Sequence, residues 1–155
     1  MPLTTPNFVA GGDVYPGTPV YIDSFTSGDN TSAIGVLQAT DATKPVLGVA
    51  GMATDYPPIN DSSHVTVSAK AAVATEPVRI FGVGEVCMAK VATGGVTAGK
   101  LVVAGGNSST TYGVTDAAEL GTQYTVGLAL QTNTVVNSWV LIQVMPGVSK
   151  NTTTI

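Results

Sequence analysis

Short strand-like runs, closely spaced and separated by turn residues, constrain the fold of this chain more than any other feature. Val, Ile, Thr and aromatic side chains gather in runs that Gly, Pro, Asn, Asp and Ser interrupt. Nine runs are predicted as strands: 14–22, 33–37, 46–50, 64–67, 78–91, 100–104, 112–115, 124–130 and 138–145. No window of about a dozen residues keeps the apolar spacing of a helix without Gly or Pro inside it. The sequence therefore predicts an all-β fold.

Two local patterns refine this prediction. At 116–120, Asp116 as N-cap and Glu119 at the capping-box position favour a single helical turn. In 138–145, period-2 alternation places Trp139, Leu141 and Gln143 on one strand face and the apolar residues at 140, 142 and 144 on the other, so we expect the Gln143 face at a rim. Trp139 is then either an aromatic that covers the core or an edge, or an anchor in a protein interface.

An internal repeat divides the chain into two sequence-similar halves. Three motifs recur in the same order at an offset of roughly 80 residues. They are VYPGTPV at 14–20 and VTAGKLV at 96–102, IGV at 34–36 and YGV at 112–114, and VLGVA at 46–50 and VGLA at 126–129. Glycine in each motif permits positive φ or close backbone approach, and such positions bend a sheet. The repeat thus predicts a small β-barrel or sandwich, which protects strand edges.

Composition excludes several classes of function. Only 10% of the 155 residues are charged, against roughly a quarter in an average soluble chain, and the net charge is -4. Direct binding of nucleic acid needs clustered Lys and Arg, so we expect no nucleic-acid partner. No apolar run approaches the roughly 18 residues of a membrane span, so we expect no membrane partner. The N-terminus lacks the features of a secretory signal, and we expect an intracellular product that starts at Met1.

The residues that usually carry chemistry are scarce. One Cys, Cys87, and one His, His64, cannot form an intrachain disulfide or a zinc site. Any Cys–His dyad would need this pair, but Cys87 lies in an apolar strand like a small core residue and His64 at the junction of a loop and a strand. We therefore expect no enzymatic activity, no cofactor, no metal and no small-molecule substrate.

One phosphate-loop motif occurs but is incomplete. Residues 94–100 fit the pattern G-x-x-x-x-G-K. Leu101 stands where Ser or Thr must ligate magnesium, and a strand follows where the phosphate site needs a helix N-terminus. The segment is interpreted as a turn that enters a strand.

The two ends differ from the middle of the chain. Two prolines and a Gly-Gly pair predict an extended N-terminal arm, and the sequence divides into an arm at 1–12, a single β domain at 13–148 and a flexible C-terminal tail at 149–155. We expect the arm to bind a partner sheet edge rather than the protein's own core. The residues assigned to that contact are Pro2, Leu3, Pro6, Phe8 and Val9.

Over most of its length the chain resembles the head-decoration, or capsid cement, proteins of tailed bacteriophages. The resemblance rests on the low-charge, Gly/Thr/Val/Ala-rich composition, the Pro-containing arm, and the V-x-[PA]-G-x-x-V elements at Val14 and Val96. It implies a β-tulip-like domain that forms a homotrimer on the outer surface of the virion capsid and cements adjacent major capsid protein subunits. The protein would be made in the host cytoplasm. The chain is longer than the smallest members, and the excess is interpreted as an outer loop or hairpin at 55–74.

A second class of function stays open at this point. A head- or tail-fibre or receptor-binding β domain would present an aromatic patch or a polar groove, and five tyrosines, at 15, 21, 56, 112 and 124, are compatible with one. A small β-barrel enzyme is a remote third reading.

Overall fold

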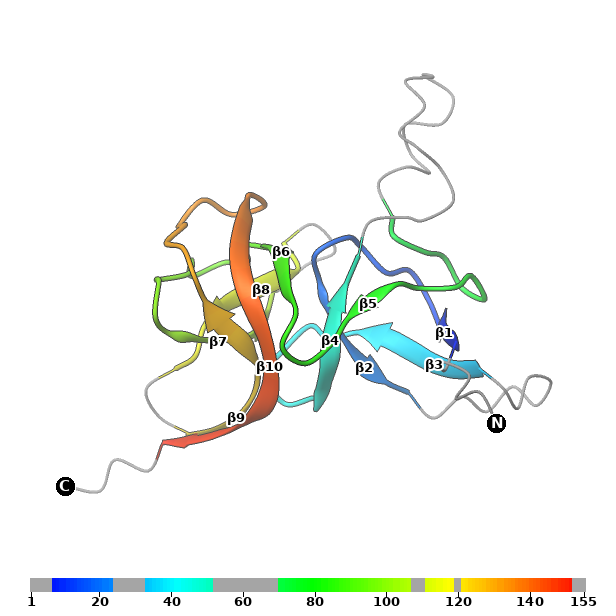
Figure 1. Cartoon of the computed structure of the whole chain (residues 1–155), viewed down its shortest axis with the longest axis horizontal. Helices are drawn as coiled ribbons and strands as arrows, with labels where there is room; N and C mark the ends of the chain where they lie inside the picture. Colours follow the sequence, from blue (N-terminus) through cyan, green and yellow to red (C-terminus); the bar gives the residue numbers. More distant parts are fainter. Residues whose placement is uncertain (1–6, 24–32, 52–69, 107–110, 119–120, 152–155) are drawn as a thin grey trace, which may run out of the picture.

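Two five-stranded sheets form the fold in the computed structural model, which describes residues 7–23, 33–51, 70–106, 111–118 and 121–151 (Figure 1). The first sheet has the order β1-β3-β2-β4-β5 and the second the order β6-β10-β9-β7-β8. The strands are β1 Asn7–Ala10, β2 Pro19–Ile22, β3 Ala33–Gln38, β4 Val46–Ala50, β5 Ile80–Phe81, β6 Val86–Lys90, β7 Leu101–Gly105, β8 Gly113–Asp116, β9 Gly121–Ala129 and β10 Trp139–Asn151. No described residue is helical, so the predicted all-β fold is confirmed.

Turn residues explain where the strands differ from their predicted bounds. The run 14–22 contributes only β2, because Gly17 takes a φ of 71° in the turn before it. The run 78–91 divides into β5 and β6 around Gly84, whose φ is 85°. Asp116 ends β8 instead of capping a helix, so that expectation is wrong at Asp116. The predicted strand 64–67 lies outside the described residues.

Each sheet is closed by a bridge between its outermost segments. In the first, Val9 of β1 pairs with Pro77, which leads into β5. In the second, Val91, directly after β6, pairs with Val114 of β8. Closure leaves fewer unpaired strand edges and makes each half a small curled sheet around its own apolar residues.

The two halves repeat the same hydrogen-bond scheme, which confirms the predicted internal repeat. The Gly17 amide donates to the Ala50 carbonyl at 2.8 Å, and the Gly99 amide donates to the Ala129 carbonyl at 2.8 Å. The first-sheet order β3-β2-β4 matches the second-sheet order β8-β7-β9. β5 corresponds to part of β10, because β5 pairs with β4 as β10 pairs with β9. β1 corresponds to the end of β6 and Val91, because both run parallel to equivalent strands, β3 and β8.

β4 joins the two hydrophobic cores. Leu47 and Ala50 contact the first core, which also contains Val20 and Val36. Val46 and Val49 point the other way and belong to the second core. Figure 1 shows β4 between the two halves, and β4 lies against β9 and β10. Since both faces of β4 are covered, its run VLGVA carries no polar side chain.

Two described segments near the ends of the chain form strands where the sequence predicts an arm and a flexible tail. Asn7–Ala10 form β1, which runs parallel to β3. Phe8 packs against the first core and Ala10 is fully buried, so the arm differs from its expected course from residue 7 onward. The described apolar residues of the arm therefore pair with and pack on the protein's own first sheet. Likewise β10 continues through Asn151, with Ser149 paired to Gln123, where a flexible tail was expected.

Gly48 and Gly127 hold equivalent positions where only a hydrogen fits. A Cβ at Gly48 would collide with the carbonyl oxygen of Phe81, and one at Gly127 with that of Gln143. Both glycines lie opposite a register shift, between Val20 and Tyr21 in one half and between Val102 and Val103 in the other. Each half therefore contains the same close approach between the backbones of two neighbouring strands.

We expect Gly127→Ala to lower the free energy of unfolding by about 2–4 kcal/mol, because the neighbouring strand must move away. Gly82→Ala is the matched control, since its Cβ would approach only Glu85 Oε2, at 3.8 Å. Denaturant unfolding measures both variants. Equal free energies of unfolding for the two variants would contradict this close backbone approach.

Candidate functional site

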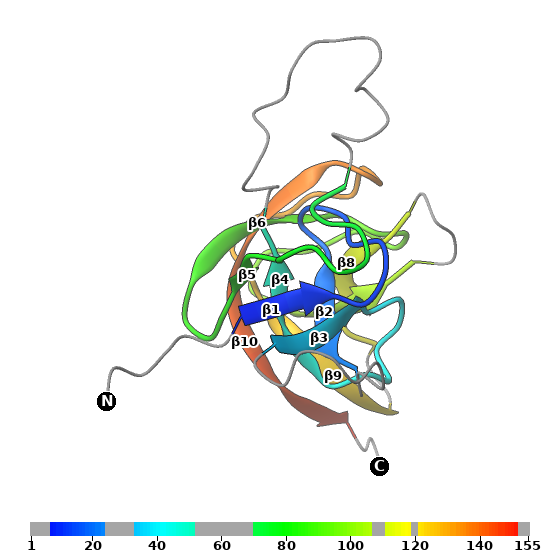
Figure 2. The same ribbon diagram turned by 90° about the vertical axis from the view of Figure 1, so that its right-hand side faces the viewer.

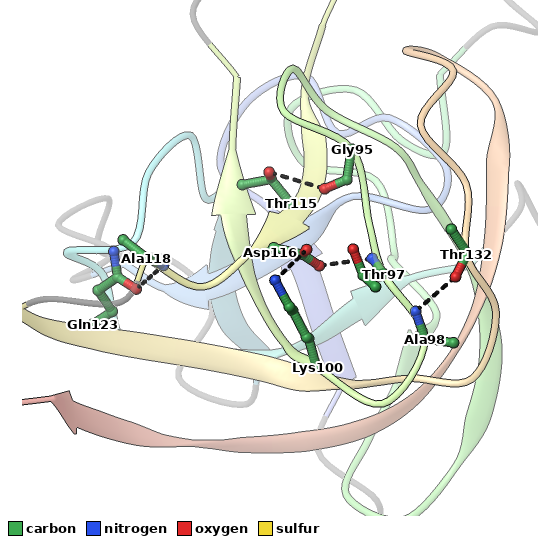
Figure 3. A network of polar contacts seen from close by, with 9 residues as sticks. All are labelled: Gly95, Thr97, Ala98, Lys100, Thr115, Asp116, Ala118, Gln123 and Thr132. Carbon is green, nitrogen blue, oxygen red and sulfur yellow. Dashed lines mark hydrogen bonds and ion pairs between the residues drawn. The ribbon is translucent and has the colours of Figure 1, made fainter.

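The segment at residues 94–100, which fits the phosphate-loop pattern, makes its hydrogen bonds within the protein (Figure 3). Every backbone amide from residue 95 to residue 100 donates to an acceptor within the chain. In order, the acceptors are Ala92 O, Asn133 O, Asp116 Oδ1, Thr132 Oγ1, Ala129 O and Thr97 O. No amide of this stretch is left for a phosphate, which supports the interpretation of the segment as a turn.

A carboxylate occupies the centre of this loop. Asp116 Oδ1 accepts a hydrogen bond from the Thr97 amide at 2.8 Å, and Lys100 Nζ lies 3.5 Å from Asp116 Oδ2 (Figure 3). The lysine of the motif is thus paired with an internal anion. In addition, Thr115 Oγ1 donates to the Gly95 carbonyl and holds the start of the loop. These contacts fix the entry into β7.

The first half holds its equivalent loop with neutral groups. The Tyr15 amide donates to Gln38 Oε1 at 3.2 Å, as the Thr97 amide does to Asp116. Thr18 Oγ1 contacts the same Gln38 oxygen at 3.2 Å, where the second half has Lys100. The same backbone is therefore anchored by a Gln–Thr pair in one half and by an Asp–Lys pair in the other. Repetition of the device indicates a structural role.

Cys87 has the environment of a core residue. It is buried among the inner residues of the second sheet, and burial, with a smaller effect of the Glu85 charge, raises the pKa of its thiol to about 11. The thiol is protonated at neutral pH and is a poor nucleophile. His64 lies outside the described residues, so a Cys–His pair is not placed by the structure.

Metal-ligating groups do not gather in the described ranges: there, no three His, Cys, Asp or Glu side chains are placed to hold a metal ion. Within the same part of the chain, no helix has the length and apolar character needed to cross a membrane.

The outer surface of β6 and β10 is the strongest candidate for a binding site. We call it the β6–β10 face and define it by Val86, Met88, Trp139 and Leu141. Leu141 pairs with Met88 across the strands, and Met88 and Trp139 are 45% and 39% exposed. Alternate residues of β10 point into the core and are fully buried, which confirms the predicted alternation. The one charged residue in the paired β6 and β10 positions is Lys90, beside Trp139.

Trp139 also covers the seam between the two halves. A Cβ at Gly17 would collide with Trp139 Cζ3, and the Lys90 amide donates to the Gly17 carbonyl at 2.8 Å. The indole therefore packs on the first half while part of its surface stays exposed. This position satisfies the edge-covering interpretation and leaves a surface on which an interface anchor can act.

The same outer surface continues across β9 and β7. Leu128 pairs with Gln143 on one side and with Leu101 on the other, and Leu101 is 40% exposed. We call Leu101, Leu128 and Leu130 the β7–β9 face. The sequence missed these two faces because Val86, Met88 and Leu101 lie in runs read only as strands. The alternation of Val86 and Met88 with the small residues Cys87 and Ala89 was the available signal.

The residues assigned to partner binding from the sequence do not gather at this surface. Phe8 and Val9 lie in β1 of the other sheet, and Pro2, Leu3 and Pro6 lie outside the described residues. The four described tyrosines lie on separate segments, with Tyr21 packed against the second core. An aromatic patch and binding by the arm both stay predictions.

No protein-family model matches the sequence, and comparisons with curated proteins and with solved structures found no match. Function is therefore inferred from the chain's own surface.

We expect Asp116→Ala to lower the free energy of unfolding by about 1–2 kcal/mol, because the Thr97 amide loses its acceptor. Asp116→Asn keeps an oxygen for that amide and loses only the pair with Lys100, so its cost should stay under about 0.5 kcal/mol. Thermal or denaturant unfolding measures both. Equal losses for the two variants would show that the ion pair, not the amide contact, holds the loop.

The thiol gives a pH-dependent prediction. Burial raises the pKa of Cys87 from 9.0 to about 11 in the folded state, so its favourable contribution is complete below pH 9 and is lost as pH rises through about 11. Cys87→Ala should therefore lose less stability than the wild type over that interval. Unfolding curves at pH 8 and at higher pH test this, and parallel pH profiles for the two proteins would contradict it.

Proposed function

We propose that this chain is a structural virion protein that binds the outer surface of a tailed-phage capsid and cements adjacent major capsid protein subunits against internal genome pressure. The observation that carries the proposal is the β6–β10 face. There, Met88, Trp139 and neighbouring aliphatic side chains stand partly exposed on a sheet whose inner side is a fully buried core.

The chemistry of this face suits a seam between protein subunits. Apolar side chains can be covered by a partner without desolvating ions, and an exposed apolar patch on a folded domain usually marks an interaction site. Trp and Met are also residue types enriched in protein interfaces. The shortage of charge in the whole chain extends the same argument to the surrounding surface.

The rigidity of the fold supports a clamping role. Both sheets are closed by bridges, and β4 packs into both cores, so force on one half is passed to the other through covalent backbone and buried side chains. Protein interiors that are packed in this way deform little under load.

The N-terminal segment provides a second contact in this proposal. Pro2, Leu3 and Pro6 belong to the residues that reach the capsid, while Phe8 and Val9 anchor the segment through β1. The protein acts as a homotrimer, made in the host cytoplasm and assembled on the outside of the virion.

Binding to purified capsids that lack the protein tests the proposal. We expect Met88→Glu to lower occupancy about tenfold, because a buried, unpaired carboxylate at the contact costs more than 1 kcal/mol. Val83→Glu is the control, since Val83 is highly exposed in the turn between β5 and β6. Removal of residues 1–6, which leaves β1 intact, should also lower occupancy.

A particle reconstruction with the wild-type protein completes the test. Density on the shell at subunit junctions supports the proposal. Density on a fibre or at the tail would favour the receptor-binding alternative, and equal occupancy of the Met88→Glu and Val83→Glu variants would remove the β6–β10 face from the contact.

A further inference from the structure

The contact between the two halves supplies a template for contact between copies. Val46 and Val49 on the outer side of β4, with Tyr21 and Phe81, belong to one apolar cluster with the inner residues of the second sheet. β4 lies directly against β9 and β10. The outer side of the first sheet thus fills the inner side of the second.

The second half carries an equivalent outer surface, and among the described residues its Leu101 and Leu128 stay partly exposed. Leu128 follows Gly127 as Val49 follows Gly48, and Leu128 pairs with Gln143 as Val49 pairs with Phe81. Val49 is fully buried, whereas Leu128 is only half-buried and its neighbour Leu101 is exposed. The β7–β9 face is therefore the free counterpart of the covered face on β4.

The first half shows the complementary feature: some residues on its inner side are less buried than their second-half counterparts, as judged from the part of the chain that the structure describes. Val126 and Ile142 of the second sheet are fully buried, but their first-sheet counterparts, Leu47 and Ile80, are only half-buried. Ala104 is 2% exposed and its counterpart Ile22 is 53% exposed. Ile22 and Ala104 hold equivalent positions in the two halves, because Ile22 pairs with Val36 and Ala104 pairs with Val114, the counterpart of Val36.

The side of the first sheet marked by Phe8, Ile22, Leu47 and Ile80 is called here the open side. Phe8 fits the same trend: it is half-buried, whereas its counterpart Ala89 is fully buried. All four residues pack toward or pair with the first core, and all are more exposed than their equivalents in the second half.

We propose that copies of this chain associate head to tail, with the β7–β9 face of one copy packed on the open side of the next. The contact repeats between chains the contact that already joins the halves within each chain. Because its two surfaces differ, it is heterologous and generates a closed ring or an open filament. The inference deepens the self-association part of the proposed function and rests on it, but it is independent of capsid binding.

Complementation between two variants tests this contact. Leu128→Glu places a charge on the β7–β9 face, and Ile22→Glu places one on the open side. Each variant alone should lose all association and run at the monomer mass in size-exclusion chromatography with light scattering, while the wild type and Val83→Glu form larger species. An equal mixture of the two variants should form a dimer of twice the monomer mass, because one intact contact is restored.

Circular dichroism and melting temperature establish that each variant is folded, and Leu101→Glu and Leu47→Gln serve as second variants of the two surfaces. A monomeric wild type overturns the proposal, as does a folded pair of variants whose mixture stays monomeric. Loss of association in Leu128→Glu but not in Ile22→Glu also overturns it, in favour of a symmetric contact. If the wild type is monomeric but occupies capsids normally, the head-to-tail inference fails and the proposed capsid function stands.

Discussion

The burial of β4 on both faces is the constraint on which the rest of the structure depends. Its side chains alternate between two cores, so neither half can form its apolar interior independently of this strand. Gly48, in the middle of β4, lets the Phe81 carbonyl approach so closely that a side chain there would collide. A strand with a polar residue, or with a larger residue at Gly48, would open both cores at once. The two halves are therefore one cooperative unit built from a repeated element.

Repetition also explains why polar side chains anchor the backbone at two equivalent loops. The loop before β2 and the loop before β7 have the same geometry, yet one is anchored by Gln38 and the other by Asp116. Both loops need a side-chain oxygen that accepts a hydrogen bond from a backbone amide, that of Tyr15 in one half and that of Thr97 in the other. Charge is optional, because Lys100 and Thr18 occupy equivalent places beside that oxygen. Lys100, which completes the phosphate-loop pattern in the sequence, is thus paired with Asp116 beside this loop.

The free surfaces of the molecule follow from the same repeat. Where the first half turns its outer apolar residues toward the second half, the second half presents corresponding residues, Leu101 and Leu128, to solvent. The adjoining β6–β10 face adds Met88 and Trp139. These partly exposed apolar side chains lie on a chain in which only 10% of the residues are charged, and exposed apolar patches commonly mark sites of protein contact.

The sequence by itself determined the all-β class, most of the strand positions and the division into two halves, because these depend on local features: β-branched runs, turn residues and glycines at fixed offsets. It also identified the buried and exposed faces of β10 from alternation alone. Only the tertiary structure decided that Asn7–Ala10 join the first sheet, that Asp116 fills the loop at 94–100, and that Val49 is covered while Leu128 is not. Those outcomes depend on which segments, distant in sequence, pack together. Residues with the same local pattern, such as Val49 and Leu128, differ in burial because only one of them meets another part of the chain.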